Sequence, residues 1–403
     1  MAEDIFYCPN CGGVMEFDVK SQKLKCPNCD HTVDIANNKK SIVEHSLTAR
    51  AMQTIKAEEK KSTTVQCKGC GAQMEVDAYS TAMSCPYCGS SYVMADKQEE
   101  VIVPDGVIPF KIDKNSAKEI VGKWLKRRYL APGELKTLYQ RGDFNGIYVP
   151  YWTFDADADA DYTGMGGRKR VEHYRDKDGK MQSRTVTDWY PTRGHVHNFF
   201  DDVLVSASSH HDRSLLDGVD DYDTKQTASY APDYMSGYGA ESFNINLDSA
   251  HGTAIGRMKS SLQDMARQDI LRRYDSAKDV HINARFKNET YKHILLPVYA
   301  VTYHYKNKVY NVLVNGQTGS IKGQYPKSVV KILLIIIAVA AILIGILFAA
   351  GSSDDDYDTY GSYGSVAEYV CEDSYGYIEC SDYQEYTVTD EGQYFEYLYN
   401  SEV

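Results

Sequence analysis

The strongest constraint on this chain is an uninterrupted apolar stretch near its C-terminus, from Ile332 to Ala350. Its 19 residues include no charged and no strongly polar side chain. As a helix rising about 1.5 Å per residue, it would be roughly 28 Å long, close to the hydrocarbon thickness of a bilayer. A buried core helix is the alternative, but core helices that are apolar on every face are rare. Because backbone groups in lipid must be paired within the segment, we expect one transmembrane helix over residues 329–350.

The charges on either side of this stretch predict its orientation. Lys322, Lys327 and Lys331 precede it, whereas the tail, residues 351–403, has 14 Asp and Glu and no Lys, Arg or His. The tail therefore has a charge of −14, whereas the whole chain has a net charge of −12, so residues 1–350 together have a charge of +2. By the positive-inside rule we expect residues 1–331 in the cytoplasm and the tail outside the cell membrane. No apolar stretch near Met1 resembles a signal peptide, so the span is also the expected insertion signal.

Eight of the ten cysteines form four CxxC pairs within the first 90 residues. In each of two units, 14 residues separate one pair from the next, and the second unit repeats the first at an offset of 59 residues. Two CxxC knuckles present four thiolates to one ion, which is the ligand set of a structural zinc site. The segments between the knuckles alternate in polarity and predict strands. We therefore predict two zinc ribbons, residues 1–36 and 64–96, each binding one Zn²⁺. Their ligands would be Cys8, Cys11, Cys26 and Cys29 in the first, and Cys67, Cys70, Cys85 and Cys88 in the second.

Two alternatives to zinc binding are four unrelated buried cysteine pairs and redox activity. A redox CxxC usually occurs singly, beside a βαβ pattern that this segment lacks. The residue after the second cysteine of a knuckle needs a left-handed backbone, which suits the glycines that follow Cys11, Cys70 and Cys88; Asp30 follows Cys29. Four cysteine ligands leave no position for water, so the zinc should be structural.

The charge of the N-terminal region bears on what the ribbons bind. Residues 1–100 have 11 Lys and Arg against 14 Asp and Glu, whereas a nucleic-acid module usually has a basic face. This balance favours a protein partner or a purely structural role, and nucleic acid remains a less favoured partner. The linker, residues 37–63, places apolar residues four apart, at Val43, Leu47, Ala51 and Ile55, and predicts a helix from about Lys40 to Lys61.

Residues 101–326 have the composition of a globular domain. A predicted strand, Val107–Ile112, precedes a helix that Asn115 or Ser116 could cap and that runs to about Tyr129. A second strand follows, from Ile147 to Asp161, and Asp178-Gly179 predicts a hairpin turn after it.

The same order recurs in the second part of this domain. Residues 243–247 precede a helix that Asp248 or Ser249 could cap and that extends to about Tyr274, and a strand follows from Ile294 to Val301. Tyr310–Val314 predicts a further strand, and Asn315–Gly319 a turn. We interpret the domain as α+β with an antiparallel sheet and an internal duplication.

Several patterns in this domain allow a chemical interpretation. By the two-residue period of a strand, one face carries four carboxylates, those of Asp155, Asp157, Asp159 and Asp161. We interpret this as a solvated acidic face; the alternative is a calcium site, although the pattern of an EF-hand is missing. The pairs His195 with His197 and His210 with His211 could bind metal, but no HExxH motif accompanies them. The segment 164–170 could cradle a phosphate, although a basic hairpin is the more ordinary interpretation. No GxxxxGK[ST] loop and no GxSxG elbow occurs, so we predict no catalytic residues and no enzyme.

The knuckles and two later segments carry a family resemblance. The CPxCG-type pairs, the segment Tyr148–Trp152, and the run from Leu296-Pro297-Val298-Tyr299 through Asn315–Gly319 to Pro326-Lys327-Ser328 resemble bacterial membrane proteins with transcription-factor-IIB-type zinc ribbons. Such proteins are sometimes described as similar to the primosomal replication helicase, an ATPase for which this chain has no Walker loop. The resemblance covers residues 1–350 and implies zinc binding and membrane attachment, without naming a reaction.

The tail has 11 Tyr beside its 14 acids. Segments around Tyr369–Cys371 and Tyr377–Cys380 alternate and predict a small hairpin closed by a Cys371–Cys380 disulfide, with two free thiols as the alternative. For the whole chain we predict a single-pass membrane protein that acts as a non-enzymatic protein-binding adaptor or assembly factor. The alternatives are a membrane-tethered nucleic-acid-binding regulator and an enzyme whose site lies between the halves of the central domain.

Overall fold

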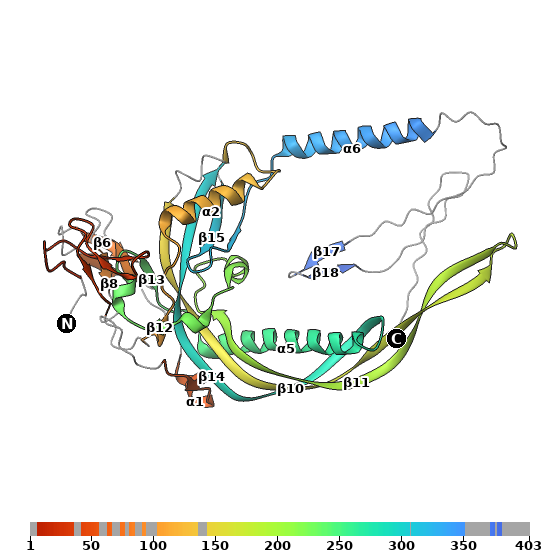
Figure 1. The fold of residues 1–403 in the computed structure, drawn as a ribbon, viewed down its shortest axis with the longest axis horizontal. Helices are drawn as coiled ribbons and strands as arrows, with labels where there is room; N and C mark the ends of the chain where they lie inside the picture. Colours follow the sequence, from red (N-terminus) through yellow and green to blue (C-terminus); the bar gives the residue numbers. More distant parts are fainter. Residues whose placement is uncertain are drawn as a thin grey trace. The chain divides into compact units, whose positions relative to one another are not determined.

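The protein is described from a computed structural model (Figure 1). The structure describes residues 6–35, 42–55, 63–66, 73–76, 80–84, 91–93, 103–135, 143–306, 308–350, 371–374 and 377–380. The chain divides into two compact units, Met1–Ile332 and Leu333–Val403, and each is described by itself. The fold is mixed α+β, as predicted, and a large sheet dominates the first unit.

The helices within the described residues differ greatly in length. They are α1 (Ala49–Thr54), α2 (Lys114–Lys126), α4 (Arg213–Leu216), α5 (Leu247–Leu271) and α6 (Val329–Ala350). Three turns of 3-10 helix lie between α4 and α5: η3 (Asp217–Val219), η4 (Thr224–Gln226) and η5 (Pro232–Met235).

The strands of the described residues form four sheets. The first ribbon contributes a small sheet of β1 (Glu16–Asp18), β2 (Lys23–Lys25) and β3 (Thr32–Val33). Two further pairs are β5 (Thr63–Gln66) with β6 (Gln73–Val76), and β17 (Cys371–Ser374) with β18 (Tyr377–Cys380). The large sheet has eleven strands: β4 (His45–Ser46), β7 (Ser80–Ser84), β8 (Ser91–Val93), β9 (Gly106–Val107), β10 (Asp143–Arg175), β11 (Met181–Ser206), β12 (Ala228–Ser229), β13 (Gly239–Glu241), β14 (Ser276–Tyr305), β15 (Lys308–Asn315) and β16 (Ile321–Gly323).

Three very long strands form the centre of this sheet. β10 pairs antiparallel with β14 from Asp143 to Gly167 and with β11 from Tyr151 to Arg175. Beyond Gly167 only β10 and β11 continue, as a two-stranded extension that we call the distal hairpin, residues 168–188. Its turn includes Gly179 with φ +78°, as the Asp-Gly pair predicts.

The alternating Ala and Asp residues of β10 determine which face is covered. Ala156, Ala158 and Ala160 are fully buried beneath α5, and α5 contributes small residues of its own, including Ala250 and Ala254. Small side chains on both surfaces allow the helix to approach the sheet closely. Figure 1 shows α5 along the concave side of the long strands.

The core lies on both faces of the sheet. On the face covered by α5, a neighbouring cluster packs α2 against β14 and β15 through Val121, Leu125 and Tyr299. On the opposite face, α4 and η3 cover apolar residues of the central strands, including Tyr151 and Leu296.

Two halves of the body follow the same plan, which fits the predicted duplication. We define the first half as β9, α2, β10 and β11, and the second half as β13, α5, β14 and β15. Each half exchanges its first short strand, so that Gly106 of β9 pairs in parallel with Ile294 of β14, and Gly239 of β13 pairs in parallel with Ile147 of β10. Ile147 and Ile294 each stand three residues before a proline, so the exchanged pairs occupy equivalent positions.

Hydrogen bonds repeat between the halves at the same offsets. The Trp152 indole N–H donates to the carbonyl of Ile245 over 3.0 Å, and the Tyr299 hydroxyl donates to the carbonyl of Ile112 over 2.8 Å. Likewise, the N–H groups of Ala207 and Gly316 donate to the carbonyls of the two prolines, Pro150 and Pro297, over 2.9 and 2.8 Å.

Some local predictions were wrong in detail. The N-cap of α2 is Asp113, whose carboxylate accepts from the N–H groups of Asn115 and Ser116, and the N-cap position of α5 is Asn246. A carboxylate two positions before Asn115, the first of the two predicted caps, therefore took its place at α2. The sheet is mixed, because the two exchanged strands pair in parallel.

The predicted linker helix was too long. His45 and Ser46 form β4 against β14, and α1 begins only at Ala49, after Thr48, whose hydroxyl accepts from Ala51 N–H. His45 and Ser46, whose spacing suggested a helix, thus pair with the edge of β14 instead. Ala51 and Ile55 still pack on the core beneath α5.

Candidate metal centre

The first ribbon folds its two CxxC pairs into two matching loops. In one, Gly12 N–H donates to Cys8 O over 2.8 Å and Cys8 N–H donates to Gly13 O over 2.7 Å. In the other, Asp30 N–H donates to Cys26 O and Cys26 N–H donates to His31 O, both over 2.9 Å. Gly12 and Asp30 have φ of 72° and 58°, so the left-handed position predicted after each second cysteine is present, at Asp30 as well as at glycine.

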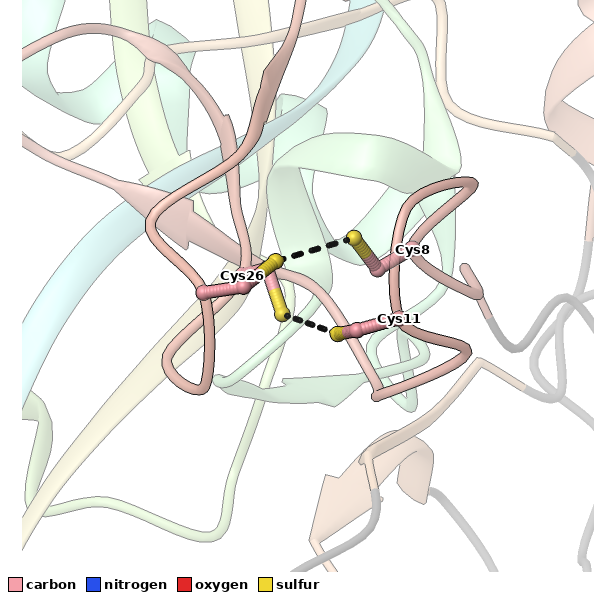
Figure 2. A group of neighbouring side chains, drawn as sticks. Cys8, Cys11 and Cys26 are labelled. Carbon is pink, nitrogen blue, oxygen red and sulfur yellow. Dashed lines mark hydrogen bonds between the residues drawn. The ribbon is translucent and has the colours of Figure 1, made fainter.

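These loops bring four sulfurs together. The Sγ atoms of Cys8 and Cys29 are 3.5 Å apart, as are those of Cys11 and Cys26, and all four lie within 4.8 Å of one another. Figure 2 shows Cys8, Cys11 and Cys26 pointing toward one common point. Zinc–sulfur bonds of about 2.3 Å in a tetrahedron require sulfurs roughly 3.8 Å apart, so the cluster fits a metal ion such as zinc with little adjustment.

The ionisation of the thiols also suits a cation. The His31 backbone N–H, followed by the Asn10 side chain, lowers the pKa of Cys29 to about 6. The Gly13 backbone N–H lowers the pKa of Cys11, but the neighbouring thiols of Cys29 and Cys26 outweigh it and raise the pKa to about 12. One thiolate therefore forms readily and the next does not, and a bound divalent cation would supply the charge that ionises the rest.

The first ribbon is fixed to the body by hydrogen bonds to backbone carbonyls. Phe17 N–H donates to Ser236 O over 2.9 Å, and the Ser236 hydroxyl donates to Met15 O over 2.8 Å. Met15 and Phe17 are buried, and the Phe17 ring meets the Tyr234 ring edge-on at 5.4 Å. Gln22 adds a hydrogen bond to Phe110 O over 2.9 Å. The metal centre is thus part of the body and lies beside the segment that leads into β13.

The second ribbon is described only in its strands. Cys67, Cys70, Cys85 and Cys88 lie outside the described residues, so their zinc site stays a prediction. β7 of this ribbon pairs antiparallel with β13, where Ala82 is opposite Ala240. Both ribbons therefore contact the second half of the body around residues 234–241.

The acidic face of β10 is neutralised by neighbouring strands. His197 contacts Asp157 at 2.6 Å, and His195 contacts Asp161 at 2.9 Å and Asp159 at 3.3 Å, all from β11. Basic side chains of β14 pair with the same carboxylates from the other side: Arg285 with Asp161 at 2.9 Å and Lys287 with Asp159 at 3.7 Å. The structure therefore places His195 and His197 against these carboxylates, within an exposed row of ion pairs across β11, β10 and β14.

Asp155 differs from the other three acids because it is buried. Its carboxylate accepts from Asp202 N–H over 2.6 Å and from the Thr290 hydroxyl over 2.8 Å, and burial raises its pKa. Carboxylates of Asp155, Asp201 and Asp202 lie within 4.8 Å of one another, a grouping that the sequence did not reveal. The Lys292 ammonium is 2.7 Å from Asp202, so an internal cation already balances this cluster.

His210 and His211 flank one partly buried carboxylate, that of Glu241. His211 Nε2 is 3.1 Å from Glu241, His210 Nδ1 is 3.6 Å from it, and the Ser208 hydroxyl donates to it over 2.8 Å. Both histidines line a cavity of about 220 Å³ with residues of β14 and β15, among them Thr302 and Asn311. Sequence reasoning missed Glu241, because a single acid at the end of a three-residue strand has no distinguishing pattern.

The glycines of segment 164–170 accommodate aromatic rings. A Cβ on Gly166 would lie 2.3 Å from the Tyr274 ring, and one on Gly167 would lie 2.9 Å from the Trp189 ring. These glycines lie within a strand and beneath side chains, which argues against the phosphate-binding interpretation.

One apolar helix near the C-terminus could span a membrane. α6 covers Val329–Ala350, in agreement with the predicted boundaries, and its segment Val329–Ile346 has a mean hydropathy of 3.1 with none of it buried. In the tail, β17 and β18 place Cys371 opposite Cys380, as the predicted hairpin requires. The disulfide itself stays a prediction.

Comparison with known proteins adds one relative. The chain is 28% identical over 325 residues to the uncharacterized protein YdjG of Bacillus subtilis (strain 168), across 80% of this chain and 90% of YdjG. No protein-family model matches the chain. No solved structure matches it either. Because YdjG is itself uncharacterized, the similarity transfers no activity to this chain.

Proposed function

We propose that the chain is a single-pass membrane protein with two cytoplasmic zinc ribbons of the transcription-factor-IIB type, a cytoplasmic α+β body and an acidic tail outside the cell. Lys322, Lys327 and Lys331 before α6 and the acids after it support this orientation. The cysteines support it too, since metal-binding thiolates need a reducing compartment and a Cys371–Cys380 disulfide an oxidising one.

The proposed role is that of a protein-binding adaptor or assembly factor without catalysis. The observation that carries it is the distal hairpin, which continues for eight residue pairs beyond the last residue of β14 that pairs with β10. Its side chains from 168 to 185 are exposed, apart from half-buried Glu172 and Asp176. A two-stranded hairpin without a hydrophobic core is at best marginally stable in water. The length of the distal hairpin therefore indicates a surface that a partner covers.

The two faces of the distal hairpin differ in charge. One face carries ion pairs, Arg170 with Asp188 at 2.7 Å and Arg184 with Glu172 at 2.9 Å. The register places on the other face residues that include no acid: Lys169, Val171, His173, Arg175, Met181, Ser183, Thr185 and Thr187. Val171 and Met181 are 60% and 62% exposed. Exposed apolar residues among basic ones fit a protein partner with an acidic, partly apolar surface.

A photo-crosslinking amino acid at position 171 would test this role in intact membranes. We expect a discrete crosslinked product from position 171 and none from position 309, where Val309 is 52% exposed on β15. Products of equal yield from both positions, or none from position 171, would count against the adaptor. A product that contains nucleic acid would instead support the tethered regulator.

A small-molecule site is the second candidate, because the cavity beside His210 and His211 joins residues distant in sequence. The Glu241 carboxylate contacts His211 and would orient its ring, an arrangement found both in catalytic bases and in ligand sites. Leu215 lines the cavity, so Leu215→Phe would fill it. A small polar ligand that raises the Tm of the wild-type chain but not of this variant would support this candidate.

The internal duplication belongs to the same proposal. The exchanged strands and the repeated hydrogen bonds of Trp152 and Tyr299 support one ancestral unit that was copied, with each copy completing the other. An adaptor is then built on a symmetric frame whose unequal additions, the ribbons and the distal hairpin, provide the binding surfaces.

A further inference from the structure

The first turn of α6 is attached to the end of α2, far from it in sequence. The Lys331 ammonium donates to the carbonyls of Tyr129 and Ala131 over 3.0 and 2.7 Å and lies over the Tyr129 ring at 5.7 Å. Ser328 N–H donates to Leu130 O over 2.8 Å. Residues up to Ile332 belong to the same compact unit as α2, so this attachment fixes the point from which the apolar helix leaves the body.

Basic side chains gather at this point. α2 ends in basic residues, and more precede α6; the set, which we call the basic collar, is Lys123, Lys126, Arg127, Arg128, Lys327 and Lys331. Lys126, Arg127 and Lys327 are exposed, and Lys123 is paired with Glu119 at 3.5 Å. The hydrogen bonds of Ser328 and Lys331 to residues 129–131 thus bring the basic end of α2, with Arg127 and Arg128 just after it, close to the lysines that precede the apolar stretch in sequence.

Aromatic rings complete the collar. The Arg128 guanidinium lies over the Trp124 ring at 4.7 Å and over the Tyr325 ring at 5.4 Å, and these two rings meet edge-on at 5.8 Å. Arg128 Nε is buried and has no hydrogen-bond partner among the described residues. Tyr129, over whose ring the Lys331 ammonium lies, is 74% exposed, and Val329 and Val330 in the first turn of α6 are 68% and 67% exposed. Trp and Tyr next to Lys and Arg at the end of an apolar helix are typical of the headgroup region of a bilayer.

We propose that the basic collar binds the phosphate headgroups of anionic phospholipids in the leaflet where α6 enters. The inference rests on the proposed membrane anchoring and adds the ligand class at its cytoplasmic end. A lipid surface is the occupant that fits, because the collar adjoins exposed apolar residues that enter the hydrocarbon, and the cytoplasmic leaflet carries the anionic lipids. Binding there would hold α2, and with it the body, at a fixed orientation to the membrane.

The test uses the full-length chain in detergent micelles, titrated with phosphatidylglycerol and, separately, with phosphatidylcholine and followed by native mass spectrometry. We expect phosphatidylglycerol to bind at least about fivefold more tightly, since each basic residue near a lipid surface contributes measurably to anionic lipid binding. The variant Lys126→Gln/Arg127→Gln/Lys327→Gln changes exposed residues only and should remove most of that preference. Its control, Lys169→Gln/Arg175→Gln/Lys177→Gln, removes the same charge from the distal hairpin and should keep it.

Equal losses in the two variants, or no preference in the wild-type chain, would overturn the lipid site. Displacement of bound phosphatidylglycerol by a DNA duplex at equal phosphate concentration would assign the collar to nucleic acid and overturn it as well. Flotation with phosphatidylcholine vesicles distinguishes failure of the lipid-site inference from failure of the proposed membrane anchoring. A chain that inserts without preferring phosphatidylglycerol refutes this inference alone, whereas a chain that does not insert refutes the anchoring too.

Discussion

Pro150 and Pro297 occupy equivalent places in the two halves of the body, but the residues packed near them differ. Five residues before the N-cap position of its helix, the first half has Ile108, fully buried in an apolar cluster. The equivalent residue of the second half is Glu241, which contacts His210, His211 and Ser208. Within the described residues, strands of both ribbons hydrogen-bond to residues 236–241 of the second half, while Gln22 of the first ribbon also donates to Phe110 O of the first half. The distal hairpin extends from the first half alone. The two halves therefore share a frame of hydrogen bonds, and they differ in the regions where we propose that the binding surfaces lie.

Loss of the first metal centre should have the largest effect on the stability of the chain, and the second half should be destabilised more than the first. Cys26 is fully buried, and Cys26→Ser removes one of the four sulfurs that we propose bind zinc, a metal on which the folding of such a small ribbon depends. We expect amide hydrogen exchange to rise strongly in residues 234–241 and much less in β9 and β12. An equal rise in both regions would contradict the one-sided docking of the ribbon.

Removal of either of the two equivalent side-chain hydrogen bonds should have a smaller effect on stability than loss of the metal centre, with the larger loss at Trp152, where a void is added. Tyr299→Phe removes only the hydroxyl that donates to Ile112 O and should lower the free energy of unfolding by about 1 kcal/mol. Trp152→Phe also leaves a small void, so a loss of about 2–3 kcal/mol is expected. Denaturant unfolding of the full-length chain in micelles would measure both. If either variant matched the wild-type chain, the two positions would not be equivalent supports of the frame.

The carboxylate that distinguishes the second half should make its stability depend on pH. Burial raises the pKa of Glu241, but hydrogen bonds from His211 and Ser208 outweigh it and leave the pKa below its ordinary value of 4.5. A lowered pKa stabilises the folded chain above pH 4.5, and this contribution disappears as the pH falls through the folded pKa.

Glu241→Gln should therefore have a lower Tm than the wild-type chain at pH 7, by the equivalent of about 1 kcal/mol or less, and the gap should close below pH 4.5. Thermal unfolding from pH 7 to pH 3 measures this. Glu119→Gln is the control, since Glu119 is 72% exposed and its pair with Lys123 should contribute little. A gap that stays constant down to pH 3 would rule out the proposed ionisation.

How far the sequence predicted this molecule depended on how local each signal was. The knuckles could be predicted because four cysteines and their left-handed neighbours lie within 23 residues, and Asp30 has the backbone expected there. α6 could be predicted because a helix long enough to cross a bilayer needs a continuous apolar segment, which is visible in the sequence. The exchanged strands could not, since β9 and β13 are two and three residues long and are defined by their partners. The cluster around Glu241 and the basic collar also escaped prediction, because each joins segments distant in sequence.

The most direct test of the account is the metal content of the full-length chain, purified in micelles without added metal. The account predicts two zinc ions per chain, and one in the Cys8→Ser/Cys26→Ser variant, because the second set of cysteines would remain. Zinc near zero in the wild-type chain would contradict the central claim that a metal-bound ribbon is part of the body.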